Sequence, residues 1–386
     1  MRKPDESFHF GSNKPGKMIG ASGILKLSIS FILAALVAGR NTALRDGIQT
    51  REWPCPVDAD IAPCVCTTDD DFNLFMECSL VKTSGELTTI FTADFPFVNF
   101  VSLTIDHAGC TDCNLNTLPA DVFGGVGFQT ITITGTNLQT VEEQAFSASH
   151  ETLKNLRLSS NKISAFPFES LGDFKVLTQL RLNGNKFNAD TPIPGIVSAT
   201  LTELNLSTND ELVITPDLVT NCPEIRIVSL RNGKIPSVPL FDTSPISMFN
   251  GLTNVHTIDF AGNAITEIQT NSIVSETDTL TKVDFSHNDI SIVHPTFVTG
   301  FSSATGNTLL MADNKISFLD EKVWAAIFEE LPVENSVDLS QNPILCGCEI
   351  AWLVNSSSKK SLTETTLCED GVQVVKNLPP AAFVDC

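Results

Sequence analysis

The sequence has few basic residues and no long hydrophobic stretch. Its 386 residues include 24 Lys+Arg against 45 Asp+Glu, which gives a formal net charge of −21. So much negative charge repels phosphate backbones and anionic lipid, which argues against a nucleic-acid-binding protein and against a membrane-surface protein. The longest apolar run, residues 27–39, is shorter than the roughly 20 residues that a transmembrane helix needs. The sequence therefore predicts no stable membrane anchor.

The usual catalytic signatures are also missing. The chain contains no His-Glu-x-x-His, no Gly-x-Ser-x-Gly, no phosphate-binding loop and no dinucleotide fingerprint. Its six histidines are scattered and form no recognisable set with cysteines and carboxylates: His9, His107, His150, His256, His287 and His294. We therefore expect no enzyme activity, no cofactor and no bound metal.

The amino end predicts secretion. The apolar run follows a basic residue, and Val37 and Gly39 are small residues at the −3 and −1 positions of a cut before Arg40. We interpret residues 1–39 as a signal peptide with an extended leader, for which Met18 is an alternative start. A signal anchor that stays uncut is the other interpretation. The predicted localisation is extracellular.

A repeated pattern of apolar residues and asparagine fills the middle of the chain. One copy is Leu153-x-x-Leu156-x-Leu158-x-x-Asn161-x-Ile163, and the next is Leu177-x-x-Leu180-x-Leu182-x-x-Asn185-x-Phe187. Ten strand positions follow at intervals of 24 to 30 residues: 103, 131, 156, 180, 204, 228, 258, 283, 309 and 337. This is the leucine-rich-repeat pattern. It predicts an α/β leucine-rich-repeat solenoid of about ten repeats with a curved parallel sheet on the concave face.

Each part of the pattern has a physical reason. The two leucine-like residues of a short strand point inward, and neighbouring repeats must stack to bury them. The asparagine amide can satisfy backbone groups of the turn. It recurs at Asn161, Asn185, Asn209, Asn263, Asn288, Asn314 and Asn342 and lapses to Thr136 and Gly233. Phenylalanines of the return segments should fill the convex side of the core, although a lipid pocket is the alternative: Phe123, Phe146, Phe166, Phe297 and Phe328.

Two groups of cysteines flank the repeats. Cys55, Cys64, Cys66 and Cys78 precede them, and Cys346, Cys348, Cys368 and Cys386 follow them. An open solenoid exposes its core at both ends, so terminal modules must cover it. We expect a linker and amino cap over residues 40–99, repeats over 100–341 and a carboxyl cap over 342–386. Each set of four cysteines allows three disulfide connectivities, and zinc ligation by Cys-x-Cys is the alternative.

The carboxyl cysteines carry a recognisable motif. Asn342-Pro343-Ile-Leu-Cys346-Gly-Cys348-Glu-Ile-Ala-Trp352-Leu353 resembles the carboxyl cap of extracellular leucine-rich-repeat proteins, and the amino cluster resembles their amino cap with wider gaps. That resemblance implies the pairs Cys346–Cys368, Cys348–Cys386, Cys55–Cys66 and Cys64–Cys78.

Three further cysteines lie within the repeats. Cys110 and Cys113 are expected to form a small local disulfide, although a redox-active Cys-x-x-Cys is the alternative. Cys222 remains unpaired at a position where a small buried apolar residue belongs. Its oxidation, or its pairing with another chain, is the other interpretation.

The residue between the two inward positions of each strand should face the concave surface. In order these are Thr104, Thr132, Arg157, Arg181, Asn205, Ser229, Asp259, Asp284, Leu310 and Asp338, with Arg231 in the flanking row. Like charges on neighbouring strands cost free energy unless something compensates them. We therefore predict a partner-binding face that is basic at Arg157, Arg181 and Arg231 and acidic at Asp259, Asp284 and Asp338. The alternative is a solvated sheet without a partner.

Two sequons and one insertion bear on that face. Asn205-Leu-Ser207 and Asn355-Ser-Ser357 predict glycosylation at Asn205 and Asn355. A glycan on Asn205 would project from the concave face and shift a partner to the ends, the flank or the convex side. The longest interval between strands includes residues 241–249, which could be a partner site or a neutral loop.

Several segments resemble one family of secreted proteins. They are Ile61-Ala-Pro-Cys-Val-Cys66, Phe95-Pro-Phe-Val-Asn-Phe-Val-Ser-Leu-Thr-Ile105, Asp121-Val-Phe-Gly-Gly-Val126, Asn137-Leu-Gln-Thr-Val-Glu-Glu-Gln-Ala-Phe146 and Phe166-Pro-Phe-Glu169. Together they resemble the crustacean leucine-rich-repeat proteins typified by the non-catalytic subunit of Oplophorus luciferin 2-monooxygenase.

That resemblance implies a secreted companion chain for a small, separate catalytic subunit, with a stabilising or carrier role and no activity of its own. The competing prediction is an extracellular recognition protein of innate immunity or adhesion, which binds protein or microbial ligands through its repeats.

Overall fold

The chain divides into two units, residues 1–49 and 50–386, and the computed structural model describes only residues of the second. The described residues are 54–241, 247–304, 306–334 and 336–386. The predicted signal peptide, most of the predicted linker and the centre of the insertion lie outside them. Among the described residues, no helix has both the length and the apolar character that crossing a bilayer requires.

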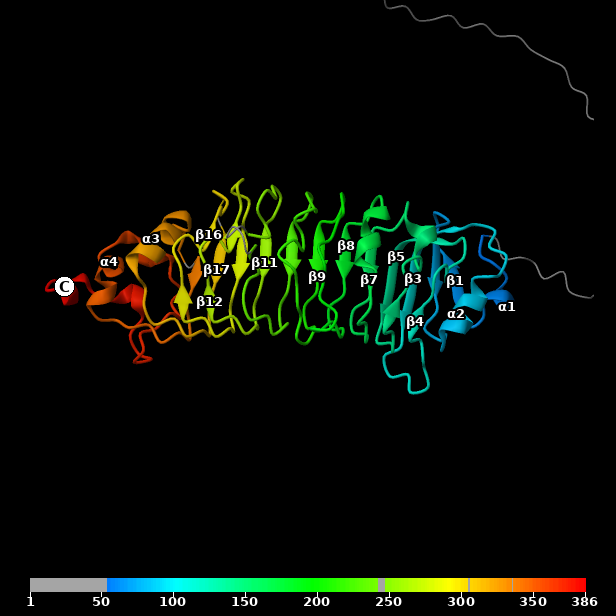
Figure 1. The fold of residues 1–386 in the computed structure, drawn as a ribbon, viewed down its shortest axis with the longest axis horizontal. Helices are drawn as coiled ribbons and strands as arrows, with labels where there is room; N and C mark the ends of the chain where they lie inside the picture. Colours follow the sequence, from blue (N-terminus) through cyan, green and yellow to red (C-terminus); the bar gives the residue numbers. More distant parts are fainter. Residues whose placement is uncertain (1–53, 242–246, 305, 335) are drawn as a thin grey trace, which may run out of the picture. The chain divides into compact units, whose positions relative to one another are not determined.

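One sheet runs through the repeats (Figure 1). Its twelve strands, in spatial order, are β1 (Val65–Thr68), β2 (Leu74–Glu77), β3 (Asn99–Asp106), β5 (Gly127–Thr134), β7 (Asn155–Arg157), β8 (Gln179–Arg181), β9 (Glu203–Asn205), β10 (Ile227–Ser229), β11 (Thr257–Asp259), β14 (Lys282–Asp284), β17 (Thr308–Leu310) and β18 (Val337–Asp338). From β2 onward every pair is parallel. All ten predicted strand positions lie in these strands, so the predicted solenoid is confirmed.

The amino cap contains a β-hairpin that extends the sheet of the repeats, which the repeat pattern does not predict. Strands β1 and β2 form an antiparallel hairpin, and β2 pairs in parallel with β3, so the cap continues the sheet of the repeats. Helices α1 (Asp58–Ile61) and α2 (Ser84–Ile90) complete this end. The hairpin gives the first repeat a neighbour and thereby covers the end of its core.

The return segments are short and irregular. Three two-stranded parallel sheets join neighbouring repeats: β4 (Thr117–Leu118) with β6 (Thr140–Val141), β12 (Glu267–Ile268) with β15 (Ile292–Val293), and β13 (Ile273–Val274) with β16 (Val298–Thr299). Short 3₁₀ helices occur at η1 (Ser147–Ser149) and η2 (Phe168–Asp173). The last repeats and the carboxyl cap carry α3 (Glu321–Glu330), η3 (Cys348–Ile350), α4 (Ala351–Val354), η4 (Ser357–Ser361), η5 (Val375–Asn377) and η6 (Pro380–Phe383).

The core lies between the sheet and the return segments. Of the phenylalanines predicted to fill it, Phe123, Phe146, Phe297 and Phe328 are buried, and Phe166 is half-buried against Phe168 with ring centres 4.9 Å apart. Neighbouring repeats also stack aromatic rings, as when Phe260 lies 5.7 Å from Phe285. The described phenylalanines of this set therefore pack in the core.

The asparagines form a buried ladder between repeats. Asn185 illustrates it: its amide donates to the carbonyls of Leu182 in its own repeat and Leu158 in the preceding repeat, both at 2.8 Å. Its side-chain oxygen accepts the N–H of Ile163 at 3.0 Å. In the repeat where Thr136 replaces the asparagine, part of the hydrogen bonding remains, since the Thr136 hydroxyl donates to the side-chain oxygen of Asn161 at 2.8 Å. Each asparagine thus connects two turns that have lost regular backbone partners.

Disulfides close both caps. The pairs are Cys55–Cys66 and Cys64–Cys78 in the amino cap and Cys346–Cys368 and Cys348–Cys386 in the carboxyl cap, which are the pairs that the cap resemblance implies. At the carboxyl end the ring centres of Trp324 in α3 and Phe297 are 5.8 Å apart. The Trp352 indole N–H donates to the carbonyl of Leu319 at 2.8 Å. Aromatic packing and disulfides together cover the last repeat.

Candidate partner-binding surface

The register of the sheet aligns the predicted concave row. Arg157 is paired with Arg181, Arg181 with Asn205, and the row continues without a break through Ser229, Asp259, Asp284, Leu310 and Asp338. In a parallel sheet, residues in register point to the same side of the sheet. The fold therefore gathers the predicted partner-binding residues of the strands into one line.

At the basic end of this row, one of the two strand arginines is already paired within the chain and the other is not. The Arg181 guanidinium binds Glu203 through two hydrogen bonds, from Nε at 2.7 Å and from Nη2 at 3.0 Å. The Glu203 side chain is 15% exposed, and the bonds to it raise the pKa of Arg181. Arg157, by contrast, is exposed and forms no ion pair within the described chain. Arg157 is thus the arginine of this pair whose charge remains open to a partner.

The acidic end has a structural role that the sequence analysis missed. A side-chain oxygen of these residues accepts the backbone N–H two positions further on: Asp259 from Ala261 at 2.9 Å, Asp284 from Ser286 at 3.0 Å, Asp338 from Ser340 at 3.0 Å, and likewise Asn205 from Ser207 at 3.0 Å. Such bonds are typical of Asx turns, which aspartate and asparagine form readily. The recurring Asp or Asn at one position of the repeat was the signal available in the sequence.

Burial alters the electrostatics of this end. Burial is the main cause that raises the pKa of Asp259, and the neighbouring Asp284 raises it further. Arg231 and Lys282 act in the opposite direction. Asp284 is 4% exposed, and Lys282 Nζ lies 3.4 Å from its carboxylate. Nearby cations therefore compensate part of the predicted acidic charge.

The two sequons lie in different surroundings. Asn205 is half-buried in the concave row, where its side chain holds the turn and the Ser207 hydroxyl lies 2.7 Å from that of Ser229. Asn355 is exposed directly after α4. Glycosylation at either site stays a prediction.

The cysteines within the repeats are accounted for. Cys110 and Cys113 form a disulfide, so their sulfurs are not metal ligands, and Asp112 between them pairs with Lys82. Cys222 is buried and unpaired, and burial raises the pKa of its thiol to about 11. A thiol with so high a pKa is a poor nucleophile near neutral pH.

Two of the histidines, His287 and His294, each contact a carboxylate. His287 Nδ1 lies 2.8 Å from an oxygen of Asp313, and His294 pairs with Glu267. The two histidines thus bind different carboxylates, although only seven residues separate them.

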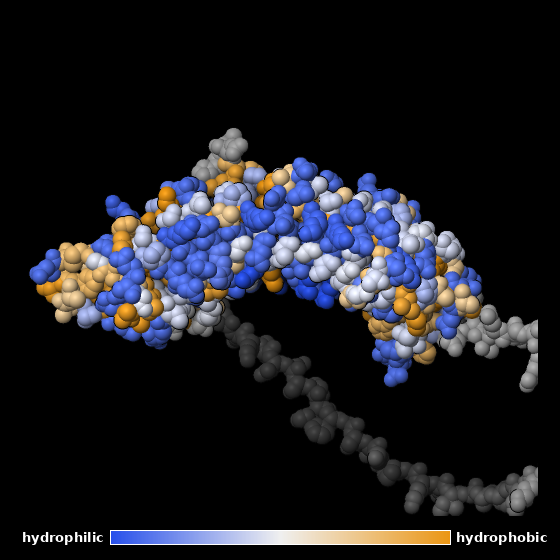
Figure 2. Space-filling model, turned by 90° about the horizontal axis from the view of Figure 1, so that it is seen from below, coloured by the Kyte–Doolittle hydropathy of each residue, from blue (hydrophilic) through white to orange (hydrophobic). Residues whose placement is uncertain are grey.

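Figure 2 shows how polarity is distributed on one side of the described unit. Hydrophilic residues cover the middle repeats, and hydrophobic residues gather toward the two ends. The caps therefore differ in surface character from the repeats between them.

Comparison with known proteins agrees with this architecture. Residues 127–187 match the family model described as leucine rich repeat. Among solved structures, one chain of the octameric complex of Latrophilin 3 (Lec, Olf), Unc5D (Ig, Ig2, TSP1) and FLRT2 (LRR) superposes with a TM-score of 0.57. The match covers 81% of this chain and 96% of that chain at 16% identity, and it concerns the fold alone.

Two curated relatives extend the comparison. Toll-like receptor 9 of Mus musculus is 28% identical over 155 residues, which is 40% of this chain but only 14% of the receptor. The non-catalytic subunit of Oplophorus-luciferin 2-monooxygenase from Oplophorus gracilirostris is 30% identical over 373 residues, covering 92% of this chain and 96% of that subunit. With this identity along nearly the whole of both sequences, the chain belongs to the leucine-rich-repeat family of the Oplophorus-luciferin 2-monooxygenase non-catalytic subunit.

Proposed function

We propose that this chain is a secreted protein-binding scaffold and the non-catalytic companion of a separate, small catalytic subunit of a luciferin monooxygenase. The observation that carries the proposal is the similarity to a protein named a non-catalytic subunit, because it covers 96% of that protein rather than one repeat. Its disulfide-closed caps suit an oxidising extracellular compartment. In this proposal the chemistry belongs to the partner, and this chain binds and stabilises it.

Co-purification tests the companion role. Tagged, secreted chain is captured from tissue extract of its source organism, and mass spectrometry with light scattering identifies what co-elutes and in what ratio. The expected result is one small chain at a fixed ratio that oxidises Oplophorus luciferin, whereas the purified scaffold does not. A scaffold that elutes as a monomer, or that oxidises the luciferin without a partner, would contradict the proposal.

We further propose that the partner contacts the concave row near Arg157. This side chain is exposed and unpaired within the described residues, whereas Arg181 is already bound to Glu203. Arg157→Glu should weaken the complex about thirtyfold or more, in the range of an interface hot spot. Lys175→Glu, which makes the same charge change at an exposed residue outside the row, should leave affinity unchanged. Equal affinities of the two variants would rule out this part of the face.

The second candidate is an extracellular recognition protein, which is supported by the partial similarity to Toll-like receptor 9. Exchangeable binding of several microbial or cell-surface molecules would favour this role. Obligate association with one small chain would favour the companion role.

A further inference from the structure

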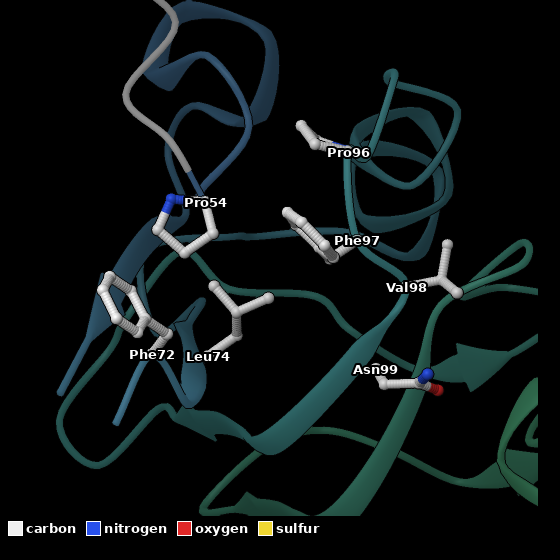
Figure 3. Close-up of a pocket in the computed structure, with 7 residues that line it drawn as sticks. All are labelled: Pro54, Phe72, Leu74, Pro96, Phe97, Val98 and Asn99. Atoms are coloured by element: carbon white, nitrogen blue, oxygen red, sulfur yellow. The ribbon is translucent and has the colours of Figure 1, made fainter. Parts of the chain in front are cut away.

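An apolar pocket opens on the amino cap (Figure 3). It has a volume of about 530 Å³ and is lined by Pro54, Phe72, Leu74, Pro96, Phe97, Val98 and Asn99. Phe72 and Leu74 come from the β1–β2 hairpin, Pro96 to Val98 come from the segment that leads into β3, and Asn99 is the first residue of β3. Phe72 is 69% exposed, which is a high exposure for a large apolar side chain.

The backbone holds Phe72 in this exposed position at a conformational cost. Its φ is 61°, in the left-handed region that bulky residues rarely adopt. Every other non-glycine residue with a positive φ in the described chain is polar. Asp69 fixes the turn, because its carboxylate accepts the N–H groups of Asp71 and Asn73 at 3.0 and 2.9 Å. Strained residues that the surroundings hold in place are often found at binding sites.

The amino cap that carries the pocket is predominantly acidic. Residues 54–99 contain eight acidic residues and a single basic one, Lys82, which pairs with Asp112. Asp70 and Asp71 directly precede Phe72 and form no ion pair within the described chain. An apolar pocket in this setting repels anionic lipid, nucleic acid and a second copy of the same acidic chain. It is complementary to a polypeptide that carries apolar and basic side chains together.

We propose that the amino-cap pocket is a docking site for a protein segment in which one or two apolar side chains lie beside lysine or arginine. The apolar side chains contact the exposed Phe72 and Val98 over the buried Leu74, and the basic residues lie against Asp70 and Asp71. Because the Asp69 hydrogen bonds already hold the backbone of the turn, binding costs little backbone conformational entropy at Phe72. This site is separate from the concave row and does not depend on the identity of the catalytic partner.

The test uses the full chain and a labelled ten-residue peptide of alternating leucine and lysine, with binding followed by fluorescence anisotropy. Phe72→Asn should weaken binding about tenfold or more, because it removes a central aromatic contact. It should also leave the thermal unfolding midpoint unchanged or raise it, since asparagine tolerates a positive φ. Phe318→Asn is the matched control, because Phe318 is a similarly exposed phenylalanine, 62%, in the last repeats. It should leave binding unchanged.

Further probes separate the alternatives. Asp70→Asn combined with Asp71→Asn should weaken binding and reduce its dependence on salt. Equal binding by wild type and Phe72→Asn overturns the proposal, as does an asparagine–lysine peptide that binds as tightly as the leucine–lysine peptide. A lower thermal unfolding midpoint for Phe72→Asn would also overturn the proposal, because it would mean that Phe72 stabilises the fold. Tighter binding of a synthetic peptide of residues 40–53, or self-association that Phe72→Asn abolishes, would assign the pocket to this chain itself and overturn the proposal.

Discussion

Replacing one ladder asparagine should destabilise the fold by a predictable amount. Asn185 is 1% exposed and makes three hydrogen bonds to buried backbone groups. In Asn185→Ala the carbonyls of Leu158 and Leu182 each keep one bond, from Asn161 and from Asn209. The Ile163 N–H loses the bond that Asn185 provides. One unsatisfied buried donor costs about 1–3 kcal/mol and each of the other two bonds about 1 kcal/mol, so we expect a loss of about 3–5 kcal/mol.

Urea denaturation followed by far-ultraviolet circular dichroism measures this loss. Asn116→Ala is the control, because Asn116 is exposed and its side chain makes no hydrogen bond in the described chain. It should change stability by less than about 0.5 kcal/mol. Hydrogen exchange should also show faster exchange of the Ile163 amide in Asn185→Ala. A loss below about 1 kcal/mol with an unchanged denaturant slope, or a loss equal to that of the control, would refute this account of the ladder.

Three other changes probe the caps, the buried thiol and the concave row. The Cys348–Cys386 disulfide spans 38 residues, and replacing both cysteines with serine should lower the unfolding free energy, measured by urea denaturation, by about 4 kcal/mol. The same replacement of Cys110–Cys113, which spans 3 residues, should lower it by about 2 kcal/mol. Equal losses would contradict the loop-entropy reasoning. Iodoacetamide at pH 8 should modify Cys222 only after the protein unfolds. Because the Cys222 thiol ionises near pH 9 in the unfolded chain and near pH 11 in the folded chain, the unfolding free energy should fall as the pH rises from 9 to 11. Asp259→Asn should raise the thermal midpoint at pH 7, since burial raises the pKa of Asp259, and the gain should vanish below about pH 4, where the unfolded carboxyl is also protonated. A destabilised Asp259→Asn at pH 7 would instead indicate that the charge itself is needed.

The repeats could be predicted because their signals are local. Each strand needs two inward apolar residues three to five positions before a turn asparagine, so Leu156, Leu158 and Asn161 suffice to predict one repeat. Copies at intervals of 24 to 30 residues then require parallel stacking, since no single copy can bury its apolar side. The register of the concave row follows from the same alignment. The domain limits, the glycosylation sites and the secretion signal stay predictions.

The charges of the concave row and the surface of the amino cap could not be predicted in the same way. The bond between Arg181 and Glu203 joins neighbouring repeats, and it depends on side-chain directions that a strand pattern does not specify. The amino-cap pocket has the turn at Phe72 on one side and Val98 on the other, and only the hairpin and its pairing with β3 bring these two segments together. A repeat pattern indicates which residues must be buried, because the buried apolar positions recur once in every repeat of the sequence. Which exposed groups neutralise one another, and which remain open to a partner, depends on contacts between segments, and these exist only in the folded chain.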